Sequence, residues 1–239
     1  MPRAVIASLF LAVAAVFALA GPARAAPMTP DQEARVRSIV REYLVQNPEV
    51  IEEALKTLEA RRIAQRRQEI ERDPRRFAIG PANAKITIVE FFDYRCPYCH
   101  AAYDWLNAKL SARKDIRYVF VEFPILGPSS LEASRAALAS MKQGRYLAFH
   151  AALMRARGEL TAERINALAK QNGIDVARMR RDMGDAAIMP LLTRNHELAA
   201  DSKVEGTPAF MINGEFFYGF DPQAMDRALR KLSAPARKS

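Results

Sequence analysis

The stretch FFDYRCPYCH, residues 91–100, contains both cysteines of this 239-residue chain, Cys96 and Cys99. It includes the end of a run of β-branched and aromatic residues, 86–92 (ITIVEFF), which is typical of a buried strand. From Pro97 onward, apolar residues recur at helical spacing, and a proline is well tolerated at the first position of a helix. The sequence therefore predicts a strand, a short turn, and a helix whose N-terminus carries Cys96.

This cysteine pair is better suited to making and breaking a disulfide than to stapling the fold. Two residues three apart on one helical face lie close enough for a disulfide. Closing so short a loop stabilises a protein by only roughly 2 kcal/mol in the chain-entropy description. A helix N-terminus stabilises a thiolate, so we expect Cys96 to be the attacking thiol. Cys99, one turn further in, is expected to be the more buried, resolving thiol.

A second motif lies further along the chain. Residues 204–212 (VEGTPAFMI) precede Asn213-Gly214, which is a strong hairpin signal. Together with residues 91–100, this motif resembles the active site and the cis-proline loop of the DsbA-like branch of the thioredoxin superfamily. The resemblance covers residues from about 78 to 233 and implies an α/β thioredoxin fold.

The remaining elements occur in the order that this resemblance implies. A second strand is expected over residues 116–123, and a final helix opens at Asp221-Pro222. Between them the pattern is helical from residue 129 to about 200. Its breaks fall near Gly144, Gly158, Gly173 and Pro190. DsbA-like proteins carry a helical domain inserted here, so the resemblance implies an insert at about 128–200 in a thioredoxin domain spanning 77–235.

The resemblance also implies roles for four residues of the two motifs. Pro97 and Tyr98, between the cysteines, would tune the stability of the thiolate and hence the redox potential. Thr207 and Pro208 would face the disulfide and would be joined by a cis bond. The Thr207 backbone would offer strand-like hydrogen bonds to an extended substrate.

Other ionisable side chains near the motifs receive separate expectations. Glu90 matches an acidic residue of the family thought to help proton transfer at the resolving cysteine. A half-exposed strand carboxylate is the alternative for Glu90, and both interpretations stay open. Glu122 is expected to be a surface charge, His100 to be exposed, and His150 and His196 to be structural.

Two other chemistries compete for the cysteine pair. Cys96-x-x-Cys99-His100 is also a haem c attachment motif. The strand that leads into it and the later proline loop argue against haem, so the expected redox group is the Cys96–Cys99 disulfide and no separate cofactor. Two thiolates can hold Cu(I) in a linear site but cannot complete a tetrahedral zinc site. Because some relatives are linked to copper tolerance, a Cu(I)-binding protein remains an alternative of another class.

The chain begins with the features of a secretory signal peptide. Arg3 precedes an apolar run, residues 4–20, which Gly21-Pro22 ends. The small-x-small pattern that follows predicts cleavage after Ala25 and export, with the periplasm as the destination. The run is slightly longer than in a usual signal, so an uncleaved anchor is the alternative. No later segment is apolar and long enough to span a bilayer.

Residues 26–76, ahead of the thioredoxin domain, predict helices with an exposed apolar stripe. Thr29-Pro30 opens the first helix, and Asn47-Pro48 interrupts the pattern before the second. Residues 59–76 are almost wholly polar and contain seven arginines. Either these helices fold back on the catalytic domain, or the stripe self-associates while the charged helix acts as a spacer. The layout resembles the suppressor-of-copper-sensitivity C proteins, whose N-terminal helices trimerise, so an oligomerisation segment with a charged linker is expected.

Composition adds limits on partners. The chain is 50% hydrophobic and 26% charged, as a globular protein is, with a net charge of +9. Its cations are mixed with acidic residues and lack interleaved aromatics, so no nucleic-acid partner is expected. The cysteine motif serves oxidases, reductases and isomerases alike. We expect a periplasmic disulfide isomerase or reductase of protein substrates, a homo-oligomer with a trimer favoured, kept reduced by a membrane-bound partner. A monomeric DsbA-like dithiol oxidase is the alternative.

Overall fold

The computed structural model describes residues 27–233, and the chain divides into two compact units, residues 1–58 and 59–239. The expected signal peptide and its cleavage site, within residues 1–25, lie outside the described residues. No helix of the described part is both long and apolar enough to cross a membrane.

The first unit contains α2 (Pro30–Gln46) and the beginning of α3 (Glu49–Arg72). Helix α2 begins with the expected cap. The Thr29 hydroxyl accepts a hydrogen bond from the Gln32 N–H at 3.3 Å, and the Gln32 side chain accepts one from the Thr29 N–H at 2.9 Å. This reciprocal pair satisfies N–H groups that the helix itself leaves without partners.

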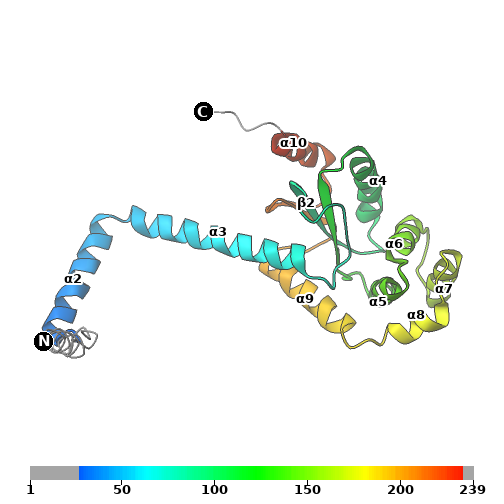
Figure 1. Ribbon diagram of the computed structural model, residues 1–239, viewed down its shortest axis with the longest axis horizontal. Helices are drawn as coiled ribbons and strands as arrows, with labels where there is room; N and C mark the ends of the chain where they lie inside the picture. The colour runs from blue at the N-terminus through cyan, green and yellow to red at the C-terminus, as the bar shows by residue number, and fades with distance from the viewer. Residues whose placement is uncertain (1–26, 234–239) are drawn as a thin grey trace, which may run out of the picture. The chain divides into compact units, whose positions relative to one another are not determined.

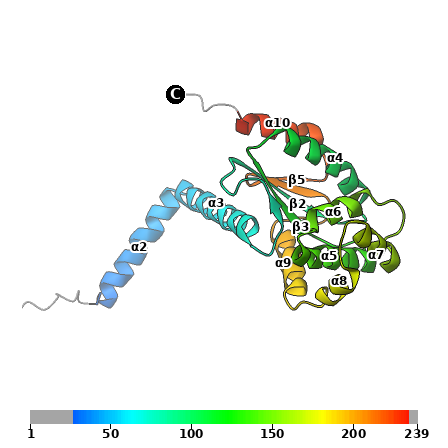
Figure 2. The ribbon, with the colours of Figure 1, turned by 45° about the vertical axis from the view of Figure 1, so that its right-hand side comes forward.

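A five-stranded sheet with the order β1-β3-β2-β4-β5 forms the centre of the second unit (Figure 2). Its strands are β1 (Ala78–Ile79), β2 (Ile86–Phe92), β3 (Ile116–Glu122), β4 (Ala209–Ile212) and β5 (Glu215–Tyr218). Strand β2 pairs in parallel with β3 and antiparallel with β4, so it lies in the middle and is buried along its whole length. The expected strands over 86–92 and 116–123 are confirmed, the second ending one residue earlier than predicted.

Alternate residues of β2 point to opposite faces of the sheet and join two separate cores. Ile88 and Phe92 pack with α4 (Pro97–Ala112), with α10 (Pro222–Ser233) and with the helices that follow β3. Val89 and Phe91 pack on the other face. Figure 1 shows α4 and α10 close together beside the sheet. The end of β2 is therefore enclosed from both faces, and Cys96 and Cys99 pack in the same core as Phe92, whereas Arg95, Pro97 and Tyr98 are exposed.

A helical insertion follows β3, as the resemblance implied. It comprises α5 (Pro128–Ser140), a short 3₁₀ turn (Met141–Gln143), α6 (Tyr146–Arg155), α7 (Ala162–Gln171), α8 (Val176–Asp182) and α9 (Ile188–Asp201). The breaks near the three glycines are confirmed, and so is the break near Pro190, which falls between Asp182 and Ile188. Pro190 lies in the first turn of α9, where a backbone N–H has no intrahelical partner to lose, and the break precedes it.

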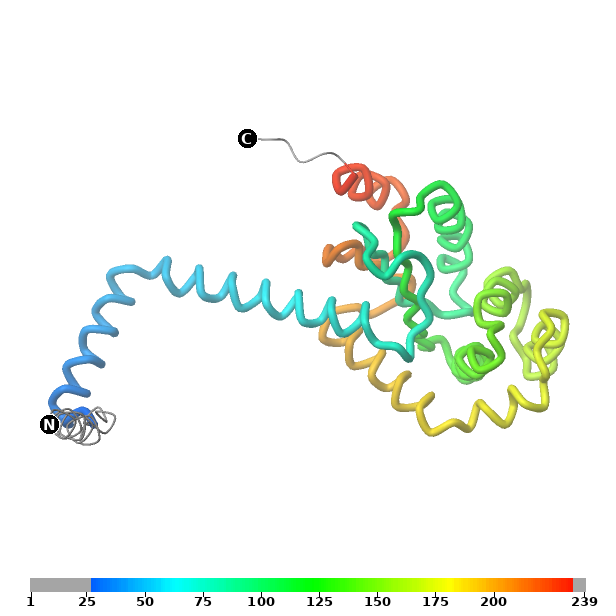
Figure 3. The backbone as a smooth tube through the Cα atoms, viewed as in Figure 1, coloured from blue at the N-terminus to red at the C-terminus, as the bar shows by residue number. Residues whose placement is uncertain are grey.

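The last turns of α3 pack against the sheet and α9, which Figure 3 shows side by side. Ile70 is completely buried in the core of that face, and Glu69 forms an ion pair with Arg194 of α9 at 2.6 Å. Arg76 is also buried and donates two hydrogen bonds, of 3.1 and 2.9 Å, to the side-chain oxygen of Asn195. Residues 59–76 were expected to act as a spacer with some freedom. Instead, Ile70, Glu69 and Arg76 attach the C-terminal half of this segment to the sheet and to α9.

The hairpin signal at Asn213-Gly214 is confirmed. Both residues have positive φ angles, 48° and 96°, and join β4 directly to β5. The Asn213 side-chain oxygen also accepts a 2.8 Å hydrogen bond from the Thr87 N–H at the start of β2. The turn thus helps to fix the register of β4 against β2.

Candidate active site

Cys96 and Cys99 lie where the chain passes from the turn after β2 into α4. Pro97 is the first helical residue, so Cys96 takes the cap position with an extended backbone, φ −79° and ψ 116°. The N–H groups of Cys99 and His100 donate to the Cys96 carbonyl at 3.1 and 3.2 Å. Both cysteines are free thiols, Cys96 4% exposed and Cys99 fully buried.

The two thiols have opposite acidities. A hydrogen bond from the Cys99 thiol lowers the pKa of Cys96 to about 6, against the effect of burial, and Thr207 and the N–H groups of the first helical turn add to the lowering. Burial, together with the hydrogen bond to Cys96 and the nearby Glu90 carboxyl, raises the pKa of Cys99. At neutral pH, Cys96 is therefore the thiolate and Cys99 remains protonated.

The second motif is brought directly to the first. The Thr207–Pro208 bond is cis, as the resemblance implied, and Cys96 Sγ lies 3.1 Å from the Thr207 carbonyl oxygen, which accepts a hydrogen bond from Cys96 in its protonated form. A hollow of about 290 Å³ lies beside these residues, bounded by Glu205 and by Tyr218 of β5. The hollow adjoins the cis-proline loop through Thr207 and Pro208, and neither cysteine lines it.

Glu90 is completely enclosed behind the thiols. It points from β2 into the interior, is 2% exposed, and accepts a hydrogen bond from the Tyr118 hydroxyl. Burial raises the pKa of Glu90 to about 8; the Tyr118 bond lowers it, and the negative charge of Cys96 raises it further. The half-exposed alternative for Glu90 is wrong.

Comparison with known proteins identifies the family of this site. The family described as Thioredoxin matches residues 72–231, more than half of the chain. This chain belongs to the thioredoxin family. The N-terminal domain of the copper resistance protein ScsC matches residues 32–65, so the resemblance to the suppressor-of-copper-sensitivity C proteins is confirmed as well.

Solved structures agree with both parts of this thioredoxin. A linker-deletion mutant of ScsC from Proteus mirabilis is 28% identical, with 88% of this chain and 99% of that chain covered and a TM-score of 0.65. The thiol-disulfide exchange protein alpha-DsbA2 from Wolbachia pipientis is 29% identical, with 75% and 98% covered and a TM-score of 0.66.

Curated relatives of this thioredoxin include much longer proteins. The Na(+)/H(+) antiporter NhaA 3 of Salinispora tropica is 30% identical over 161 residues, which are 66% of this chain and 25% of that protein. The chain thus spans about a quarter of the length of such relatives.

The expectation that Glu122 is a surface charge is wrong. Glu122 is 1% exposed, and burial raises its pKa to about 8. Its carboxyl accepts hydrogen bonds of 2.9 Å from Tyr94, 2.8 Å from Tyr146 and 2.7 Å from Ser134. The alternation of β3 already contained this signal, because Tyr118, Phe120 and Glu122 fall on one face and the first two are aromatic.

The remaining side chains with expectations from the sequence differ in their exposure to solvent. Tyr98, expected to tune the redox potential, is 69% exposed and lies between the two cysteines in the sequence. His100 is half-buried rather than exposed, and its Nε2 donates to the Tyr94 carbonyl at 2.7 Å. His150 is fully buried against aromatic rings, and His196 is exposed and packs on Phe123.

The geometry bears on the two competing chemistries. Haem attachment requires both sulfurs to be open to the porphyrin, whereas here both are buried under the cis-proline loop, so the residues do not fit haem. No group of three or more metal-binding side chains occurs in the part of the chain that the structure describes. The Cys96–Cys99 pair offers two sulfurs, the donor set that linear Cu(I) accepts.

The two buried carboxyls predict that the oxidised protein loses stability as the pH rises from about 6.5 to about 8. Folding raises the pKa of Glu90 and Glu122 from 4.5 to about 8, so each keeps its proton in the folded state while the unfolded chain releases it. Unfolding then releases protons, and each carboxyl is expected to lower the free energy of unfolding by about 1 kcal/mol per pH unit. His150 gives the opposite trend only below pH 6.5, because burial lowers its pKa to about 3.

Urea unfolding at a series of pH values measures this slope. Glu122→Gln should remove about half of it, because the amide does not titrate. The oxidised form is used because the lowered pKa of Cys96 makes the reduced form gain stability between about pH 6 and 9. Equal slopes in the two proteins would show that Glu122 is ionised in the folded state.

Proposed function

We propose that this thioredoxin catalyses thiol–disulfide exchange on protein substrates through Cys96 and Cys99. The supporting observation is the contrast between adjacent thiols, one with its pKa lowered to about 6 and the other with its pKa raised. A two-step exchange needs this contrast, because the thiolate attacks in the first step and the protonated thiol reacts only in the second.

Reduction of a substrate proceeds by two displacements. The Cys96 thiolate attacks one sulfur of the substrate disulfide, whose S–S bond breaks, and the other sulfur leaves as a thiolate. Cys99 then loses its proton and attacks Cys96 Sγ, which forms the Cys96–Cys99 disulfide and releases the second substrate thiolate. Two electrons pass to the substrate, and the reverse sequence oxidises a dithiol. In isomerisation, a second substrate thiolate attacks the mixed disulfide in place of Cys99.

Glu90 would take the Cys99 proton. Its Oε1 is buried and has no hydrogen-bond partner among the described residues, and its charge helps to keep the pKa of Cys99 high. With a pKa of about 8, Glu90 is mostly protonated at neutral pH, and its ionised fraction, roughly one-tenth at pH 7, would accept the proton as Cys99 attacks. The raised pKa of Glu90, about 8, suits it to accept and return this proton near neutral pH.

The substrate would bind as an extended segment along Thr207. Strand-like pairing with a backbone is a general mode of peptide recognition and does not depend on sequence. Tyr98 and Tyr218, 69% and 61% exposed, add aromatic surface near this line. Such a site accepts many unfolded protein segments, as an exchange enzyme must.

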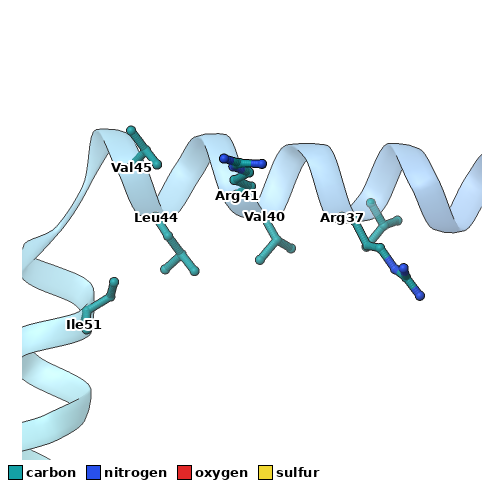
Figure 4. A pocket seen from close by; sticks show the side chains of 7 residues that line it. Arg37, Val40, Arg41, Leu44, Val45 and Ile51 are labelled. Atoms are coloured by element: carbon teal, nitrogen blue, oxygen red, sulfur yellow. The ribbon is translucent and has the colours of Figure 1, made fainter.

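The first unit suggests how several sites would be gathered. Helix α2 buries none of its residues, although Val36, Ile39, Val40 and Tyr43 are apolar and about half exposed. Figure 4 shows Val40 and Leu44 on one side of α2, where with Ile51 of α3 they line a hollow of about 480 Å³. Helices without tertiary packing are marginal in water, so a second copy of the same segment is the partner that this stripe fits.

We propose that the protein is a homo-oligomer, with a trimer favoured, and that it acts as a disulfide isomerase or reductase in the periplasm. Several active sites facing one substrate raise the effective concentration of thiols, which helps an isomerase to attack again after a failed first exchange. A membrane-bound partner would return electrons to the Cys96–Cys99 disulfide.

Leu44→Glu is expected to dissociate the oligomer and to reduce reshuffling of a scrambled disulfide protein roughly ten-fold or more, while reduction of a small disulfide stays unchanged. A charge in the stripe must be desolvated on assembly, which disfavours association. Light scattering and the two assays measure the outcome.

Ser38→Glu is the matched control, because position 38 lies on the opposite side of α2 from the stripe. It should keep both the mass and the isomerase activity. A wild-type protein that is monomeric in solution would contradict the proposal and would favour the DsbA-like oxidase.

A further inference from the structure

The three-residue turn between β2 and α4, residues 93–95, is tied to the segment that follows β3. The Asp93 carboxylate accepts hydrogen bonds from the N–H groups of Ile125 and Leu126 at 2.8 and 2.9 Å, and from the Ser130 hydroxyl of α5 at 2.7 Å. Asp93 also accepts, through its carbonyl, the Cys96 N–H at 3.1 Å. The hydrogen bonds to the Asp93 carboxylate fix the start of the turn to the residues just before α5 and to α5 itself.

Tyr94, two residues before Cys96, is hydrogen-bonded through both its side-chain hydroxyl and its main-chain carbonyl oxygen. Its hydroxyl lies 2.9 Å from Glu122 Oε1 and 3.0 Å from His150 Nδ1, and its carbonyl oxygen accepts the 2.7 Å hydrogen bond from His100. The side chain is 1% exposed. Tyr94 therefore joins the first turn of α4 to the interior beneath the insertion.

Glu122 is the centre of that interior cluster. Its other donors come from the insertion itself: Ser134 belongs to α5 and Tyr146 to α6. No cation contacts the Glu122 carboxyl among the described residues. Hydroxyl donors take the place of a cation: Tyr94 and Tyr146 donate to Oε1 and Ser134 donates to Oε2.

We propose that Tyr94 and Glu122 are positioning residues for the reaction at Cys96, through which the helical insertion holds the attacking sulfur at the N-terminus of α4. This role rests on the proposed thiol–disulfide exchange. The stabilising field of a helix N-terminus falls off within its first turn, so a small displacement of Cys96 weakens it. Fixing the residue two positions earlier keeps Cys96 in that field and beside Thr207.

Tyr94→Phe tests the proposal, with Tyr146→Phe as a matched control. Each variant removes one buried phenol hydroxyl that bonds the same oxygen of Glu122, at 2.9 and 2.8 Å, but only Tyr94 belongs to the active-site turn. Tyr94→Phe should raise the pKa of Cys96 by up to about one unit, because the free energy of one hydrogen bond corresponds to about that shift. Tyr146→Phe should lose similar thermal stability and leave the pKa of Cys96 within about 0.2 units of wild type.

Ultraviolet absorbance of the thiolate against pH gives the pKa without any substrate. Equal pKa values in Tyr94→Phe and wild type, or equal shifts in both variants, would overturn the positioning role. A shift confined to Tyr94→Phe in a protein that performs no exchange would keep the positioning role and reject the proposed function.

His100 provides a second route to the same answer if Tyr94→Phe does not fold. His100→Ala removes the hydrogen bond to the Tyr94 carbonyl from a half-buried position, so the fold should tolerate it. The pKa of Cys96 should rise in this variant and return in His100→Gln, whose amide can donate the same bond. No rise in His100→Ala, or a rise that glutamine does not reverse, would contradict the anchoring of Tyr94.

Discussion

Cys96→Ser should abolish disulfide reduction by this protein, leaving the uncatalysed background rate. The hydroxyl of serine does not ionise near neutral pH, so the variant has no nucleophile at the helix N-terminus. The fold should persist, because the substitution exchanges one small side chain for another at the cap position, where serine is a favoured residue. Reduction of a protein disulfide, followed against a chemical reductant, measures the loss.

Cys99→Ser gives the complementary outcome. Cys96 can still attack, but nothing displaces the substrate from it, so mixed disulfides should accumulate and should disappear on addition of a small thiol. Non-reducing electrophoresis shows them directly. Full activity in Cys96→Ser, or trapping by Cys96→Ser in place of Cys99→Ser, would reverse the assigned roles.

Iodoacetamide at pH 7 should modify Cys96 in the reduced protein and leave Cys99 unmodified. With a pKa of about 6, Cys96 is roughly nine-tenths thiolate at pH 7 and one-tenth at pH 5, so its alkylation rate should fall about ten-fold between them. Cys99 is fully buried and its pKa is raised, so almost none of it is thiolate at either pH. Mass spectrometry of the two cysteine peptides measures the selectivity.

Denatured protein serves as the control, because unfolding gives both thiols ordinary acidity and both should then react. Equal labelling of the two cysteines in the folded protein would show that the hydrogen bonds to Cys96 Sγ do not stabilise its thiolate.

Local patterns predicted the elements that hold the cysteines because each of those patterns is complete within a short segment. The strand over 86–92 is one uninterrupted buried run, and α4 starts at a proline in the position that prolines favour. The Asn213-Gly214 turn likewise depends only on two residues that accept positive φ.

The errors concern polar residues whose partners are distant in the sequence. Glu122 was expected at the surface because its three hydroxyl donors lie in three different elements. Arg76 was expected to belong to a charged linker, and its partner Asn195 lies 119 residues away. A charged residue is buried when the fold supplies its partners, and a single sequence does not show which residues the fold will bring together.

The Asn195 amide connects Arg76, which follows α3, to Glu122 at the end of β3. Its oxygen receives two N–H groups of Arg76, and its nitrogen donates to the main-chain oxygen of Glu122 at 2.8 Å. With donors and acceptor fixed in this way, the amide has one orientation only, and rotating it would set like groups against each other at both ends. One planar group thus links the segment that follows α3 to the last residue of β3, whose side chain accepts the hydrogen bond of Tyr94.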